Sequence, residues 1–143
     1  MTAFYTSEDE IEVLTEAFVA KTLEKDKWTH AAHLTIAVWH LKEFDYDEAV
    51  ALVRKRITEY NLAVGTQNTA TSGYHETMTI FWMTVVHFFV RRVQAQTTFE
   101  VCNLLLAGPL ASNTLPFYFY ERVTIFIIRS KGCVCKAGQG GIE

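Results

Sequence analysis

Apolar residues recur every three or four positions along most of the chain, which is the spacing expected of amphipathic helices. In the first segment, Ser7 and Glu10 have the spacing of a capping box. Asp26 is the expected cap of the second segment. The pattern predicts five helices, over residues 8–23, 27–44, 45 or 46 to 61, 73–94, and 98 to the break at Gly108-Pro109.

Helices joined by short loops, without alternating strands, predict an all-α fold. We expect a single-domain helical bundle of about five helices over residues 1–143. The connection over residues 66–72 is rich in side chains that favour turns and caps. The β-branched run at 123–128 is the one credible strand or arm, and residues 130–143 are expected to form a flexible, glycine-rich tail.

The composition narrows the range of partners. Half of the 143 residues are hydrophobic and 20% are charged, which predicts a dense core or a surface buried by self-association. A homo-oligomer is therefore expected, with a dimer favoured. The net charge of −3 provides no basic footprint, so no nucleic-acid partner is expected.

Membrane insertion and secretion are not expected either. The longest charge-free stretch, residues 77–90, is too short to span a bilayer. The acidic N-terminus lacks the order of a signal peptide. An odd number of cysteines, Cys102, Cys133 and Cys135, fits reduced thiols in a cytoplasmic protein.

Candidate chemistry is concentrated in two strings, Trp-Thr-His-Ala-Ala-His-Leu at 28–34 and Gly-Tyr-His-Glu-Thr at 73–77. On a helix, His30, His33 and His40 share one stripe, and the small Ala37 leaves room between them. This helix is apolar nearly all round, so it is expected to be central. His40 is interpreted as a polar residue at the edge of the core rather than as a ligand.

In the second string, His75 and Thr79 form one stripe of a helix and Glu76 belongs to the next, about 100° away. The free amides of a first helical turn favour a carboxylate such as Glu76. We expect the helices at 27–44 and 73–94 to pack side by side. His30, His33 and His75 would then converge on one cavity, with Glu76 at its rim.

Three interpretations of this cluster remain open. In the first, His30, His33 and His75 bind a divalent metal, with Glu76 as fourth ligand, base or orienter. The chain has no His-Glu-x-x-His string to support this. In the second, the same groups line a pocket for a small polar molecule, where histidine can also transfer protons. The ligand-binding candidates are Trp28, His30, His33, Asn68, Tyr74, His75, Glu76 and Thr79.

In the third interpretation the histidines are structural. They would bond one another, Thr29, Tyr74 and backbone carbonyls, while the protein acts as an oligomeric interaction module. Trp28, like the other tryptophans, would then be a core anchor. The chain shows no recognisable nucleophile arrangement, phosphate loop or dinucleotide fingerprint. Whether it is an enzyme is left open.

The two strings resemble those of a family of small, uncharacterised bacterial proteins with paired Trp-Thr-His-x-Ala-His-Leu and Thr-Ser-Gly-Tyr-His-Glu-Thr motifs. The resemblance covers roughly residues 15–120 and is carried by Trp28-Thr29-His30, Ala32-His33-Leu34, Tyr60-Asn61, Asn68-Thr69 and residues 71–77. It implies a common helical fold and a shared purpose for the strings, but no activity. After about Tyr120 the chain departs from the family pattern, as a recombined gene end of a mobile gene cassette would produce.

Overall fold

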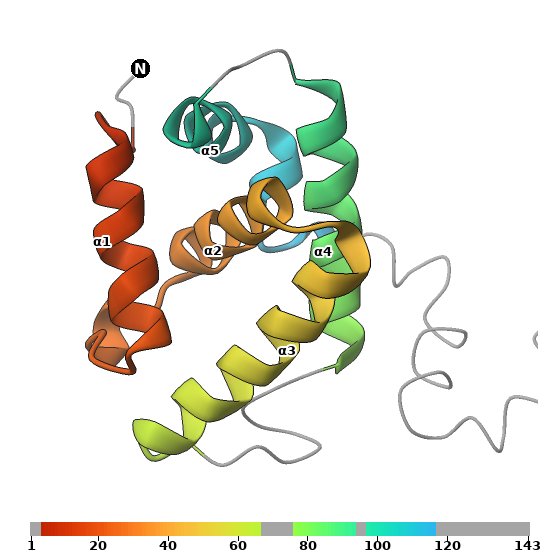
Figure 1. Cartoon of the computed structure of the whole chain (residues 1–143). Helices are drawn as coiled ribbons and strands as arrows, with labels where there is room; N and C mark the ends of the chain where they lie inside the picture. The colour runs from red at the N-terminus through yellow and green to blue at the C-terminus, as the bar shows by residue number, and fades with distance from the viewer. Residues whose placement is uncertain (1–3, 67–75, 94–96, 117–143) are drawn as a thin grey trace, which may run out of the picture.

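The computed structural model describes residues 4–66, 76–93 and 97–116. Within these ranges the chain is all-α and contains no strand (Figure 1), which confirms the predicted fold class. Of two 3-10 turns, η1 (Lys25–Lys27) lies between the first and second helices, and η2 (Pro109–Ala111) follows the fifth. The helices are α1 (Glu8–Val19), α2 (His30–Glu43), α3 (Tyr46–Ala63), α4 (Glu76–Arg92) and α5 (Thr98–Ala107).

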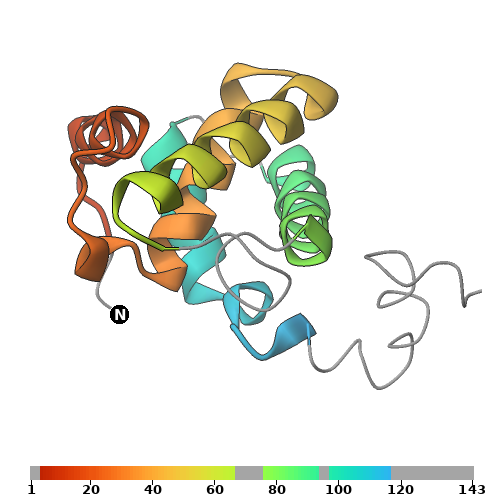
Figure 2. The same cartoon turned by 90° about the horizontal axis from the view of Figure 1, so that it is seen from below.

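Helix α2 lies at the centre of the bundle and packs against each of the other four helices (Figures 1 and 2). Leu34, Ile36 and Val38 lie on different sides of α2, yet each is no more than 1% exposed. A helix that buries side chains all round cannot carry a polar stripe. The prediction of a central helix from residues 27–44 is confirmed.

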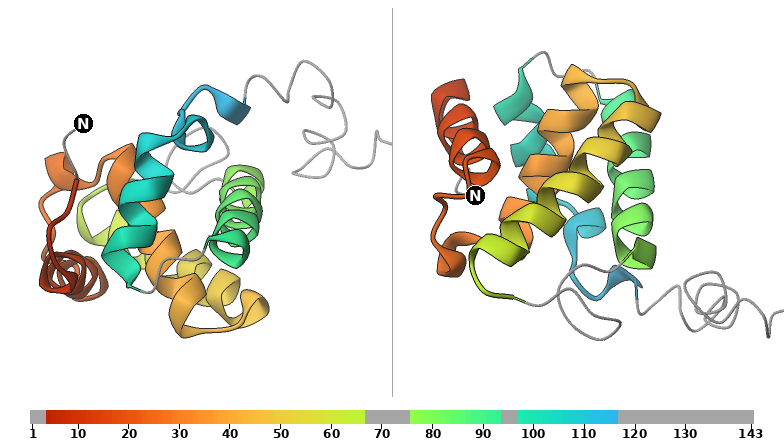
Figure 3. Two further views of the ribbon diagram at one scale, coloured as in Figure 1. Left: turned by 90° about the horizontal axis from the view of Figure 1, so that it is seen from above. Right: turned by 60° about the horizontal axis from the view of Figure 1, so that its bottom comes forward.

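The core has two parts, on either side of α2. The larger part packs apolar residues of α2 and α3 against α4 and α5. The smaller part lies under α1 and contains Phe18, Leu23, Ile36 and Tyr60. Helices α1 and α4 lie on opposite sides of α2, and α3 crosses in front of it (Figure 3). This arrangement leaves the N-terminal turn of α2 facing both α3 and α4.

Helix α1 ends at Val19, four residues before the predicted end. Lys21 adopts a left-handed conformation with φ 65°, and Thr22 N donates to Ala17 O at 2.8 Å, so the helix cannot continue. The predicted capping box at the start of α1 is also wrong. Ser7 is the N-cap residue but makes no side-chain cap bond.

Helix α2 begins at His30, three residues later than predicted, because Thr29 and not Asp26 is its cap. The Thr29 hydroxyl accepts a hydrogen bond from Ala32 N at 3.1 Å. Asp26 lies within η1, which is a separate turn. Trp28 therefore lies just outside α2, with φ −86° and ψ 66°, and its ring can fold back over the first turn of the helix.

The other predicted helix ends agree more closely. Asp45 caps α3 by accepting from Glu48 N at 2.9 Å, and α3 continues two residues beyond Asn61. A capping box does occur, but it lies at the start of α5, where the Thr97 and Glu100 side chains bond reciprocally. Helix α5 ends before Gly108-Pro109, as predicted.

Some predicted features lie outside the described residues. These are the strand or arm at 123–128, the tail at 130–143, and residues 73–75 of the fourth predicted helix. The strand, the tail and the expected homo-oligomer all stay predictions. None of the described helices has the length and hydropathy that crossing a bilayer requires.

The segment before α1 is held against α5 by Asn103. Its Oδ1 accepts from Phe4 N at 3.0 Å and from Tyr5 N at 2.9 Å, while its Nδ2 donates to Tyr5 O at 2.8 Å. One amide side chain thus satisfies three backbone groups from a distant part of the chain. This contact closes the bundle on the side of α1.

We predict that Asn103→Ala destabilises the protein by about 1–3 kcal/mol, because it leaves partly buried backbone groups without partners. Urea unfolding followed by circular dichroism measures the effect. The control is Asn113→Ala, which changes an exposed asparagine and is expected to have almost no effect. Equal stability of the two variants would contradict the assigned role of Asn103.

Candidate functional site

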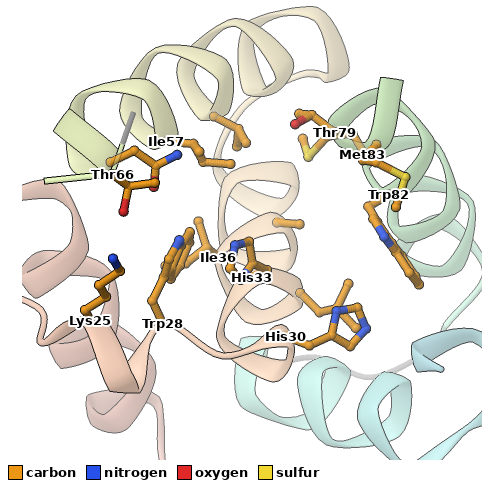
Figure 4. Close-up of a pocket in the computed structure, with 15 residues that line it drawn as sticks. Lys25, Trp28, His30, His33, Ile36, Ile57, Thr66, Thr79, Trp82 and Met83 are labelled. Atoms are coloured by element: carbon orange, nitrogen blue, oxygen red, sulfur yellow. The ribbon is translucent and has the colours of Figure 1, made fainter. Parts of the chain in front are cut away.

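A cavity of about 560 Å³ lies where the first turn of α2 faces α3 and α4 (Figure 4). Its walls are mainly hydrocarbon, contributed by Leu34, Ile36, Ala37, Val53, Ile57, Met78 and Met83. Its remaining lining residues are aromatic, polar or charged: Lys25, Trp28, His30, His33, Asn61, Thr66, Thr79 and Trp82. An apolar cavity with a few placed polar groups is typical of a small-molecule site.

Trp28 forms the centre of an aromatic stack that holds His33 in place. Its indole stacks on Phe18 at 4.5 Å between ring centroids and on the imidazole of His33 at 3.7 Å. Tyr60 packs against the same indole at 5.4 Å, and its hydroxyl donates to Leu23 O at 2.8 Å. Because Phe18 and Tyr60 are fully buried, they fix the indole, and the indole fixes the imidazole.

The tautomer of His33 follows from its hydrogen bond. Nδ1 lies 2.7 Å from Thr29 O, and a carbonyl oxygen can only accept, so Nδ1 carries the proton. Nε2 then holds a lone pair and has no hydrogen-bond partner among the described residues. Burial lowers the pKa of His33 to about 4, the Thr29 bond opposes this, and His30 nearby lowers it further. His33 is therefore neutral near pH 7.

His30 lies on the same cavity but is tied to other elements. Its Nε2 lies 2.8 Å from Ala111 O in η2, so this nitrogen donates to the carbonyl. The ring also meets Trp82 of α4 edge-on at 5.0 Å. These contacts leave Nδ1 as the only nitrogen of His30 that a ligand can use.

The second string contributes less to the described cavity than predicted. Thr79 lines it, as expected. Glu76 is not among the lining residues, although it was expected at the rim. Arg54 of α3 instead donates to both Glu76 oxygens, with Nε 2.9 Å from Oε1, and both side chains are more than 40% exposed. This bidentate pair joins the start of α4 to α3.

Asn68, Tyr74 and His75, three of the predicted ligand-binding residues, lie outside the described residues. The predicted convergence of His75 with His30 and His33 therefore stays a prediction. Helices α2 and α4 do pack side by side, as expected for the helices predicted at 27–44 and 73–94 (Figure 3). The segment 67–75 is joined to Thr66, which lines the cavity, and to Glu76.

His40 does not line the described cavity. It was expected at the edge of the core, but it is fully buried. Its Nδ1 donates to Ile36 O at 2.8 Å and its Nε2 accepts from Arg56 at 2.8 Å. Burial lowers the pKa of His40 to about 4, helped by the charge of Arg56. Arg56 is thus bound to the buried ring of His40.

Sequence reasoning missed the contributions of η1 and α3 to the site. Lys25, Asn61 and Thr66 supply polar groups, and Val53 and Ile57 supply part of the wall. A signal for Asn61 was present, since an asparagine close to the end of an amphipathic helix precedes the polar connection. No comparable signal marks Lys25, which resembles any other surface lysine.

Comparison with known proteins finds no match: no family model, no curated protein and no solved structure is significantly similar to the chain. The family resemblance of the two strings therefore stays a prediction. Among the described residues, no group of three histidine, cysteine, aspartate or glutamate side chains is placed to hold a metal ion. The cavity is thus the feature of the described residues that bears on function.

The lowered pKa values of His33 and His40 predict acid destabilisation. Unfolded histidine titrates near 6.5, so between about pH 6.5 and 4 the unfolded chain binds protons that the folded chain does not. The stability is complete above this window and declines as the pH falls through it. Each histidine can contribute up to about 2 kcal/mol of loss between about pH 7 and 5.

Urea unfolding at several pH values measures this dependence. His33→Gln is expected to lose less stability on acidification than the unmodified protein, by the amount that one histidine contributes, up to about 2 kcal/mol. NMR titration of the histidine Cε1–H resonances measures the pKa of each histidine directly. A midpoint for His33 at or above 6.5 would contradict the assignment of a neutral, desolvated imidazole.

Proposed function

We propose that the protein binds a small organic molecule in the cavity between α2, α3 and α4, with His33 Nε2 as the hydrogen-bond acceptor. The observation that carries this proposal is a neutral imidazole, fixed in one orientation and tautomer, with a lone pair exposed to a largely apolar cavity. The cavity volume of about 560 Å³ lies within the range of about 300–1,000 Å³ found for small-molecule sites.

Comparison of the two histidines with lowered pKa values supports a binding role. His40 has both ring nitrogens satisfied, by Ile36 O and by Arg56, as a structural histidine requires. His33 has only Nδ1 satisfied, by Thr29 O. His33 lines the cavity, so its second ring nitrogen is the one that a bound molecule could use as an acceptor.

The same chemistry favours binding over proton abstraction. An imidazole whose conjugate acid has a pKa of about 4 is a weak base, so it accepts a hydrogen bond but takes a proton only from an acidic group. His33 can transfer a proton only if a bound molecule or an anion raises its pKa. Binding is therefore the primary function that we propose.

We predict that 4-methylphenol, which has an apolar ring and one donor, binds to the protein and shifts the His33 Cε1–H resonance. Ala37→Leu adds a bulky side chain to the cavity wall and is expected to abolish this binding. Ala51→Leu makes the same change at an exposed position of α3 and should leave binding intact. Absence of the shift, or equal binding by both variants, would refute the proposal.

A metal site is the second candidate function. His30 and His33 each donate a hydrogen bond from one ring N–H to a backbone carbonyl, which is how metal-binding histidines are commonly oriented. Their spacing of three residues on α2 suits ligands from one helix, and His75 was predicted as the third. A divalent metal with these three ligands is the form of the proposal.

Elemental analysis of the purified protein after incubation with Zn²⁺ tests the metal proposal. Near-stoichiometric metal that is lost in His33→Ala and retained in His87→Ala would support it. His87 is a matched control because it lies on α4, packs against Tyr46 and does not line the cavity. Equal metal content in the two variants would refute a site at His33.

A further inference from the structure

We infer that the molecule bound in this cavity is an amphipathic organic acid that carries a hydroxyl or N–H donor. Its apolar body would lie on the hydrocarbon wall, its donor on His33 Nε2, and its carboxylate beside Lys25. This inference rests on the proposed function, since it names the class of molecule that the same cavity would take.

The charge of the cavity lining favours an anionic ligand. Lys25 is the only residue with a permanent charge among the described lining residues, which include no aspartate or glutamate. Lys25 forms no ion pair with another described residue. Its acidic neighbours Glu24 and Asp26 are exposed and lie outside the lining. An anionic group is therefore favoured over a cationic one at this end.

The position of Lys25 indicates where the anionic group would lie. Figure 4 shows its side chain beside Trp28, reaching in the direction of Thr66 on the opposite side of the opening. Thr66 and Asn61 also line this end of the cavity. A carboxylate here would meet an ammonium group while remaining close to solvent, which keeps its desolvation small.

The wall on the α4 side of the cavity indicates where the apolar part of the ligand would lie. Beyond His33, the wall on the α4 side consists of Met78, Thr79, Trp82 and Met83, as Figure 4 shows for the last three. Methionine side chains adapt to irregular apolar shapes. This end suits a ring or chain, while the charged group stays at the end with Lys25. The cavity therefore has its permanent charge at one end and, at the other, a mainly apolar wall that also includes the Thr79 hydroxyl and the His30 ring.

Three matched probes test the class. These are 3-(4-hydroxyphenyl)propanoate, its O-methyl ether, which lacks the donor, and its methyl ester, which lacks the charge. In the unmodified protein we expect the ether to bind about two- to tenfold more weakly than the acid, as for loss of one hydrogen bond. The ester should bind about two- to fivefold more weakly, as for an exposed ion pair, and added salt should reduce this difference.

Two variants assign these differences to residues. Lys25→Gln should remove the preference for the acid over the ester, whereas Lys27→Gln, in the same turn but outside this cavity, should keep it. His33→Phe preserves a ring on Trp28 and should remove the preference for the phenol over the ether. Calorimetry or ligand-observed NMR measures all affinities.

The possible failures are distinguishable. If 4-methylphenol and all three probes fail to bind, both the proposed function and this inference are wrong. If 4-methylphenol binds but the ester binds as tightly as the acid, the cavity takes small molecules and only the inferred class is wrong. A preference for the acid that persists in Lys25→Gln also overturns the inferred class.

Discussion

The stacking of Trp28 between Phe18 and His33 is the contact on which the candidate site depends. It joins α1, through Phe18, to the first turn of α2, and Tyr60 adds α3 to the same aromatic cluster. Trp28 can take this position because α2 begins at His30, with Thr29 as its cap, which leaves the indole free to fold back. The orientation of His33 is thus a result of packing among three helices, not of local helix geometry alone.

The two histidines of α2 with lowered pKa values show how one environment can serve two purposes. Both rings are desolvated, so both are neutral near pH 7. The difference lies in the second nitrogen, which Arg56 occupies in His40 and which the cavity exposes in His33. Burial alone does not identify a functional histidine, because the unsatisfied nitrogen carries the information.

The sequence pattern predicted the fold class, the central position of α2 and the side-by-side packing of α2 and α4. It also predicted four residues that line the cavity: Trp28, His30, His33 and Thr79. These features follow from hydrophobic periodicity, which a single sequence displays. The start of α2 and the end of α1 were wrong, because they depend on which hydroxyl reaches an amide and on one left-handed residue, Lys21. Lys25 was missed because only tertiary packing brings η1 to the cavity, whereas the position of Asn61 just before the polar connection was a signal in the sequence.

The position of Glu76 affects the chemistry more than any other correction. As a rim carboxylate it would have offset the charge of Lys25 and favoured a cationic or metal ligand. Paired with Arg54 on the outside of the bundle, it contributes no charge to the cavity lining and instead fixes the first turn of α4 against α3. The described lining therefore combines one permanent positive charge with the neutral imidazole of His33. A mainly apolar cavity whose described lining carries one permanent charge, the Lys25 ammonium, favours amphipathic anions over cations, because the anionic group can pair with Lys25 near solvent while the apolar part lies on the hydrocarbon wall.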